Sequence, residues 1–112
     1  MNKSYGQPEC PLARSLEAIG ERWTVLLLRE LFLRGSRRFQ DFLDAFPGLS
    51  PNTLSARLKE LEDQGLVVRR LYEERPPRME YVLTELGQTA GPVMKALRAW
   101  GTKLLEDDRL KV

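Results

Sequence analysis

The chain has 112 residues, of which 42% are hydrophobic and 30% charged, and it carries a formal net charge of +2. A chain of this length builds one domain, here expected to span residues 1–112. The modest charge permits a polyanionic partner without requiring one. With no histidine and a single cysteine, Cys10, the sequence excludes zinc sites of the Cys/His kinds and Ser-His-Asp or Cys-His catalysis.

Other classes of protein are excluded by what the sequence lacks. It has no glycine-rich phosphate loop. No apolar run reaches the ~20 residues needed to cross a bilayer, and the N-terminus has no apolar signal core. We therefore expect a cytoplasmic protein that is neither an enzyme nor membrane-bound and that needs no metal or cofactor.

The first predicted element is a short helix within residues 8–20. In "PLARSLEAIG", Leu12, Leu16 and Ile19 fall on one face, and Gly20 ends the pattern. A central helix follows. Residues 23–33 are apolar on nearly all sides, which predicts burial on several sides and the middle of the core.

Residues 39–64 predict a helix-turn-helix. Pro47 and Gly48 stop its first helix, while Ser50 and Pro51 read as the N-cap and first turn of its second. That second helix runs to about Gln64. The apolar positions of the first helix are Phe39, Phe42, Leu43 and Phe46.

The hydrophobic period then changes to that of strands. "LVVRRLY" and "MEYVLT" flank "EERPPR", whose prolines exclude helix and stiffen the tip. Residues 66–84 therefore predict a two-stranded wing. Thr84 caps a final helix at residues 85–107, which Gly91 and Pro92 should kink or delay. The expected fold is α+β, mainly α: a winged helix-turn-helix with a three-helix core and flanking N- and C-terminal dimerisation helices.

The helix after Ser50 has two different faces. Leu54, Leu58 and Leu61 cluster on one side. A helix entering the major groove needs short donors and a long cation on its outer face, and its N-terminus favours phosphate. The DNA-binding candidates from this helix are Ser50, Pro51, Asn52, Thr53, Ser55 and Lys59. The alternative is an ordinary solvated face, because Ser, Thr and Asn also serve as caps.

Further basic residues surround this helix. Arg75 and Arg78 lie near the stiff wing tip, where guanidinium groups can reach phosphate or a minor groove. Arg37 and Arg38 precede the helix-turn-helix, where cations meet the DNA backbone. Arg57 is a further phosphate candidate, although its position beside the leucines also allows pairing with Asp63 or Glu60. For Arg37 and Arg38 the alternative is an ordinary solvated charge pair, and for the wing it is a charged hairpin that only resists edge-to-edge pairing.

The terminal helices predict a homodimer. The apolar stripe of the last helix is too long to leave exposed on a monomer, and a twofold dimer would cover it and space two recognition helices for an inverted repeat. The alternative is packing against the first helix of the same chain. The expected interface residues are Leu12, Leu16, Val93, Leu97, Trp100 and Leu104.

Cys10 lies just before the first helix, where the helix dipole favours a thiolate. It is a candidate redox sensor that could pair with Cys10 of a second subunit, and the alternative is a buried, inert thiol. A small-molecule effector could bind at the dimer junction near Trp23 and Trp100, although aromatic residues at helical spacing are more often core.

Three stretches of the sequence together resemble the HxlR family of winged-helix transcription regulators, relatives of the MarR group. They are "CPLARSLEAIGERWTVLLLREL", "GSRRFQDFLDAFPGLSPNTLSARLKELEDQGLV" and "PPRMEYVLTELG". The resemblance implies a homodimer joined by its terminal helices and DNA binding through residues 51–64 and the wing. It also implies that a cysteine at position 10 senses oxidants in some members. The alternative function is a winged-helix module for protein–protein assembly; the operator, the effector and the direction of regulation stay open.

Overall fold

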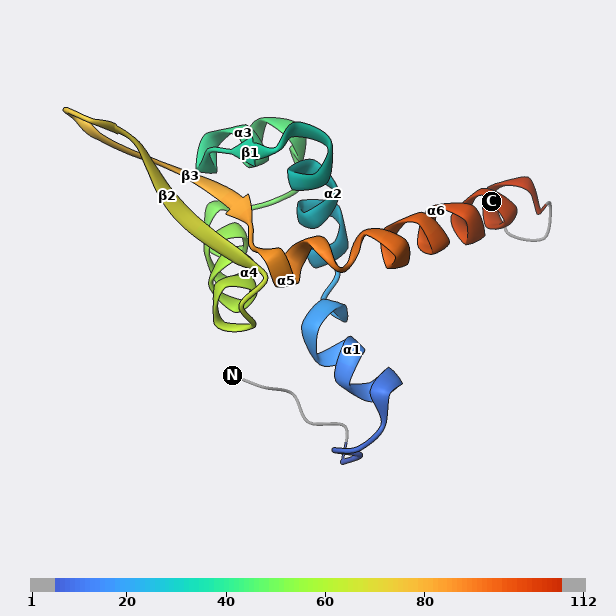
Figure 1. Cartoon of the computed structure of the whole chain (residues 1–112). Helices are drawn as coiled ribbons and strands as arrows, with labels where there is room; N and C mark the ends of the chain where they lie inside the picture. The colour runs from blue at the N-terminus through green and yellow to red at the C-terminus, as the bar shows by residue number, and fades with distance from the viewer. Residues whose placement is uncertain (1–5, 108–112) are drawn as a thin grey trace.

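The computed structural model of the chain describes residues 6–107, so the two ends of the expected domain lie outside the described residues. The fold is a mainly helical α+β winged helix-turn-helix, as predicted (Figure 1). Its elements are α1 (Pro11–Ile19), α2 (Thr24–Arg34), β1 (Ser36–Arg37), α3 (Phe39–Ala45), α4 (Pro51–Asp63), β2 (Val67–Glu74), β3 (Pro77–Leu83), α5 (Glu85–Gln88) and α6 (Gly91–Glu106). None of these helices is long and apolar enough to span a membrane.

The core forms where α2, α3 and α4 meet. Its fully buried side chains are Leu27, Leu28, Leu31, Phe42, Leu54, Leu58 and Leu61. Each is worth roughly 1.5–3 kcal/mol of transfer free energy, so the helical leucine spacing of α4 fixes which of its sides faces outward.

The predicted burial of α2 on several sides is wrong for part of the helix. Leu33 is 66% exposed, and Val25 and Phe32 are only partly buried. The all-round apolar pattern therefore has two origins. One face of α2 belongs to the core, and the other faces α6.

The sheet contains a strand that was not predicted. In the described chain, β1 pairs antiparallel with β3, which also pairs with β2. A two-residue strand is too short to show a periodicity. The wing tip is also shorter than the predicted "EERPPR": Glu74 pairs with Pro77, which leaves Arg75 and Pro76 as the turn. Pro77 is tolerated because it is the first residue of its strand.

The C-terminal helix is delayed at the glycine–proline pair, as predicted. The short α5 is followed by α6, which has its proline in the first turn, where a missing N–H breaks no helical hydrogen bond. Figure 1 shows α6 extending away from the domain and away from α1. The alternative in which the apolar stripe packs on the first helix of the same chain is therefore not what the structure shows.

Candidate nucleic-acid interface

The N-terminus of α4 is built by its cap. Ser50 Oγ accepts a hydrogen bond from the Thr53 backbone N–H at 3.2 Å and donates one to Thr53 Oγ1 at 2.9 Å. Pro51 occupies the first turn. The cap satisfies one of the free N–H groups, and the positive end of the helix dipole remains at the surface, where it favours an anion such as phosphate.

The outer face of α4 carries the predicted small polar residues. Asn52 and Ser55 are exposed, and Thr53 is partly buried at the edge of the face. Lys59 is 73% exposed and forms an ion pair with Asp63 at 3.0 Å, one turn further on. An exposed pair of this spacing contributes only about 0.3–0.5 kcal/mol, so the lysine can leave Asp63 for another anion at little cost.

Arg57 lies on a different side of α4 from Lys59. Its guanidinium binds Glu21 and Glu60, each at 2.9 Å, and its side chain is 20% exposed. The expected pairing with Glu60 is confirmed. A phosphate contact from Arg57 would require both ion pairs to open, which makes it the weakest DNA-binding candidate of this helix.

Arg37 and Arg38 are neighbours with different surroundings. Arg37 donates to the buried Glu30 carboxylate at 2.8 Å and is 21% exposed, while Arg29 approaches the other carboxylate oxygen at 3.3 Å. The hydrogen bond from Arg37 is the largest cause that lowers the pKa of Glu30 below its ordinary value. Arg37 is thus tied to the core, and Arg38 is left at the surface.

Arg38 connects the start of α3 with the wing. Its backbone N–H donates to Asp41 at 2.9 Å, which fixes the helix start. Its guanidinium donates to the Tyr72 hydroxyl at 3.3 Å and lies over the Tyr72 ring. The hydrogen bond to Tyr72 raises the pKa of Arg38 above its ordinary value. These contacts hold the exposed cation between α3 and β2.

The wing arginines differ in how far they are already paired. Arg69 binds Glu62 of α4 at 3.2 Å, and Arg70 binds Glu80 of β3 at 2.6 Å. Arg78 approaches its cross-strand neighbour Glu73 at 3.4 Å. Arg75 lies at the turn and forms no ion pair with any residue that the structure describes. This pattern favours Arg75 as the most available cation of the wing.

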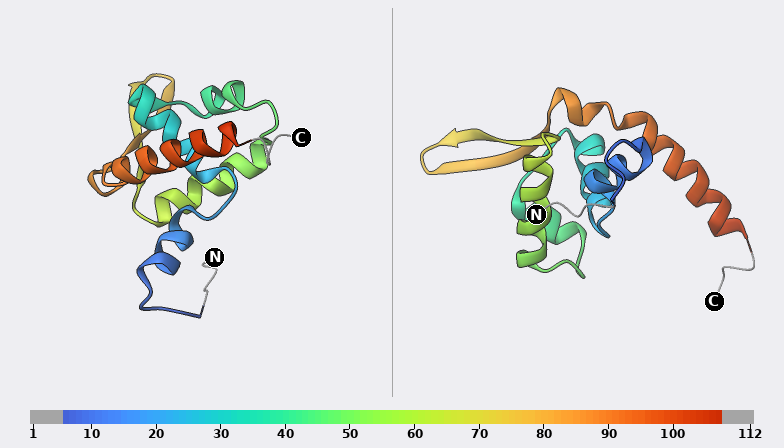
Figure 2. Two further views of the ribbon diagram at one scale, coloured as in Figure 1. Left: turned by 90° about the vertical axis from the view of Figure 1, so that its right-hand side faces the viewer. Right: turned by 90° about the horizontal axis from the view of Figure 1, so that it is seen from below.

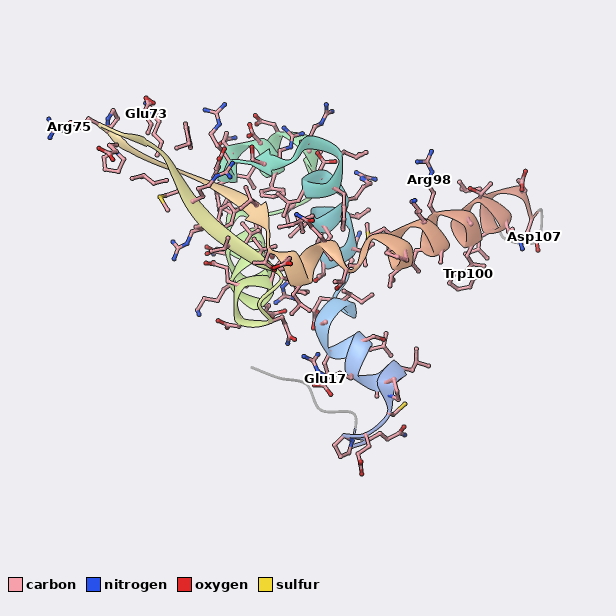
Figure 3. All side chains as sticks on the ribbon, in the orientation of Figure 1. Glu17, Glu73, Arg75, Arg98, Trp100 and Asp107 are labelled. Atoms are coloured by element: carbon pink, nitrogen blue, oxygen red, sulfur yellow. The ribbon has the colours of Figure 1, made fainter. Side chains whose placement is uncertain are left out.

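The candidate residues gather at one end of the molecule. Figure 1 shows the wing and α4 on the side of the domain opposite to α6, and the view from below agrees (Figure 2, right). Figure 3 places Arg75 at the far tip of the wing. One side of the molecule therefore carries the polar helix face and the wing, and the other carries the exposed apolar helix.

The terminal helices expose the residues expected at a dimer interface. Trp100 is 60% exposed, Leu12 is 71% exposed, and no residue of α6 is buried among the described residues. The remaining expected interface residues, all exposed, are Leu16, Val93, Leu97 and Leu104. On a monomer this is a large apolar surface in contact with water.

Cys10 is the N-cap of α1. Its Sγ accepts a weak hydrogen bond from the Ala13 N–H at 3.5 Å, and the residue is partly buried. The thiol thus points at the N-terminus of the helix, as the sequence predicted, and it is neither deep in the core nor fully exposed.

Comparison with known proteins decides the family. The model of the HxlR-like helix-turn-helix family matches residues 18–109. The chain belongs to the HxlR-like helix-turn-helix family. It is 42% identical over 99 residues to the HTH-type transcriptional regulator sll1512 of Synechocystis. The matched region covers 88% of this chain and 73% of that relative. It is also 38% identical over 94 residues to the HTH-type transcriptional regulator YdeP of Bacillus subtilis, and this match covers 84% of this chain and 73% of YdeP.

Solved structures of similar regulators have the same fold. The redox regulator HypR in its oxidized form superimposes with a TM-score of 0.77 at 35% identity, covering 84% of this chain and 96% of HypR. The reduced form of the transcriptional regulator YodB from B. subtilis superimposes with a TM-score of 0.71 at 35% identity, covering 81% of this chain and 89% of YodB. The chain is therefore a DNA-binding helix-turn-helix transcriptional regulator of this family, and not an enzyme.

Sequence reasoning missed three residues that hold arginines of the candidate interface. Tyr72, Glu21 and Glu30 were not among the predicted site residues. Each holds an arginine from another element. The available signal was weak: a charge inside an apolar helix requires a partner, but the sequence does not say which one.

Proposed function

We propose that this chain acts in the cytoplasm as a homodimer that binds an inverted-repeat DNA operator. The observation that carries the proposal is the outer face of α4. Asn52, Ser55 and Lys59 face solvent because the leucines on the opposite side are buried in the core. A helix with short polar groups and one mobile cation fits the major groove, with Arg38, Arg75 and Arg78 placed to contact flanking phosphates.

Dimerisation is supported by α6. A helix with no buried residue and with an exposed tryptophan is unstable in water on its own. A second copy related by a twofold axis would cover both helices and present two α4 helices to successive major grooves. The two halves of the operator would then be inverted repeats.

Selection of bound sites from a random duplex library tests this function. We expect an inverted repeat to be enriched. Binding should weaken steeply as salt concentration rises, because lysine and arginine side chains that contact phosphates release bound counterions into solution. The alternative, a module for protein–protein assembly, predicts no enriched sequence and a shallow salt dependence. That outcome would reject the proposal.

Lys59→Ala is expected to weaken binding to the selected operator by about 1–3 kcal/mol if Lys59 contacts a base. Binding to unrelated duplexes should change much less. The measurement is fluorescence anisotropy with both kinds of duplex at several salt concentrations. Lys103→Ala removes an equivalent charge from exposed α6 and should leave affinity unchanged. An equal loss on all duplexes with a smaller salt slope would assign Lys59 to phosphate, and no loss would remove it from the interface.

A second function, regulation by oxidation, is favoured by Cys10. Its sulfur caps α1, and HypR, a similar protein, is named a redox regulator. We propose that the Cys10 thiols of two subunits form a disulfide. The pair loses two protons and two electrons, and a diazene oxidant such as diamide accepts them and becomes the hydrazine. The bond would change the position of α1 and, through Glu21 and Arg57, that of α4.

Diamide should convert the wild-type protein to a covalent dimer on a non-reducing gel and change its operator affinity at least ~10-fold, with dithiothreitol reversing both effects. A coupling of this size, about 1.4 kcal/mol, is ordinary for allosteric proteins. Cys10→Ser should retain operator binding and ignore diamide. If diamide changes neither the gel mobility nor the operator affinity of the wild-type protein, or if it changes those of the serine variant, Cys10 is not the sensor.

A further inference from the structure

We propose that the groove between α2 and α6 binds a small organic carboxylate with an apolar body. The groove has a volume of about 600 Å³, which is within the range of small-molecule sites. It is lined by Val25, Leu26, Arg29, Phe32, Leu33, Gly91, Met94, Lys95, Leu97 and Arg98. The α2 side chains that line it include Leu26 and Phe32, which also pack against the edge of the core.

The groove walls match the two parts of such a ligand. Leu26, Phe32 and Met94 are partly buried and form an apolar surface. Lys95 and Arg98 come from α6, and neither forms an ion pair with any residue that the structure describes. No acidic residue lines the groove. The charge complementarity therefore favours an anion over a cation or a neutral molecule.

Arg29 gives the groove a connection to the DNA-binding side. It lines the groove, binds Glu30 at 3.3 Å and lies over the Phe46 ring, which follows α3. A carboxylate that attracted Arg29 would compete with Glu30 and Phe46. A bound ligand would therefore change the contacts of Arg29 with the helix-turn-helix as well as those of α6.

The groove and the proposed dimer surface lie on different sides of α6. Residues two positions apart on a helix point in nearly opposite directions, and Figure 3 shows Arg98 and Trp100 leaving opposite sides of α6. Leu97 lies between the two surfaces. A dimer formed through Trp100 thus leaves the Arg98 side open to a ligand.

This position differs from the effector site expected near Trp23 and Trp100, which stays a prediction. Neither tryptophan lines the groove. Trp23 packs edge-on against Phe46, with ring centroids 5.7 Å apart, and Trp100 is exposed. Trp23 is therefore used in the domain itself, as aromatic residues at helical spacing usually are.

The probe for this site is 2-naphthoate, compared with the neutral 2-naphthamide of the same shape. In protein labelled with ¹³C at the methionine methyl groups, 2-naphthoate should shift the signal of Met94 and leave that of Met79, on the distant wing, unchanged. The amide should bind at least ~10-fold more weakly, because it cannot form charge-assisted hydrogen bonds.

Variants separate the proposed site from nonspecific binding. Lys95→Gln combined with Arg98→Gln should weaken 2-naphthoate binding ~10-fold to the level of the amide, and Lys103→Gln, elsewhere on α6, should not. Equal affinities of the wild-type protein for the two probes would overturn the proposal. So would saturation with no shift of Met94, or naphthoate binding that disappears as the protein dimerises, which would assign the groove to a second copy of the chain. These outcomes are independent of DNA binding, so they do not depend on the proposed operator.

Discussion

Trp100→Glu is expected to make the protein monomeric and to weaken binding to an inverted-repeat operator by at least ~100-fold. Trp100 is exposed on α6 with no buried neighbour on that helix. A carboxylate in its place would lie unpaired in the proposed twofold interface, opposite its own symmetry mate or close to it. Losing the second subunit removes an effective-concentration advantage of about 10²–10⁴.

Sedimentation equilibrium and anisotropy measure the two effects separately. The variant should keep the circular dichroism of the wild type, because Trp100 lies outside the core, and its weak binding to a single half-site should be unchanged. Thr102→Glu adds the same charge on another side of α6, where Thr102 is exposed, and should stay dimeric. A dimeric Trp100→Glu protein with full operator affinity would reject α6 as the interface.

Glu30→Gln is expected to lower the free energy of unfolding by about 1–3 kcal/mol at neutral pH. Glu30 is 6% exposed and accepts from Arg37 at 2.8 Å. The amide keeps the shape but loses the charge, which leaves the guanidinium of a largely buried arginine without its counterion. The Nε of Arg37 is already buried without a hydrogen-bond partner in the described chain, so the site cannot easily compensate.

The effect of this substitution should depend on pH with a defined sign. The pKa of Glu30 is lowered from its ordinary value of 4.5, mainly by Arg37. A carboxyl group with a lowered folded-state pKa stabilises the protein fully above the unfolded value, and the contribution is lost as pH falls through the folded value. The stability difference between wild type and Glu30→Gln should therefore be constant near neutral pH and shrink below about pH 4.5.

Urea unfolding at a series of pH values measures this difference. Asp63→Asn is the control, since it removes a carboxylate from an exposed ion pair with Lys59 and should change stability by less than about 0.5 kcal/mol. A Glu30→Gln protein as stable as the wild type at neutral pH would contradict the assigned role of the buried pair. A difference that grows on acidification would contradict the direction of the pKa shift.

Helix α4 and its N-cap were largely predictable, because the sequence features that specify them lie close together in the chain. Ser50, Pro51 and the leucines of α4 lie within a few residues of one another, and helix caps and a 3.6-residue period act at that range. The same holds for the delay of α6 at Gly91 and Pro92. The two-residue β1 and the short wing turn were missed or misjudged, because their limits are set by pairing with β3.

The sequence by itself determined the helix-turn-helix, the wing, the family and which face of α4 points outward. Only the tertiary structure decided which cations are available to DNA. Arg37 and Arg38 are neighbours, yet one is tied to Glu30 and the other lies free of the core beside Tyr72. Long side chains choose partners from elements distant in sequence, as Arg57 does with Glu21, and no local pattern encodes that choice.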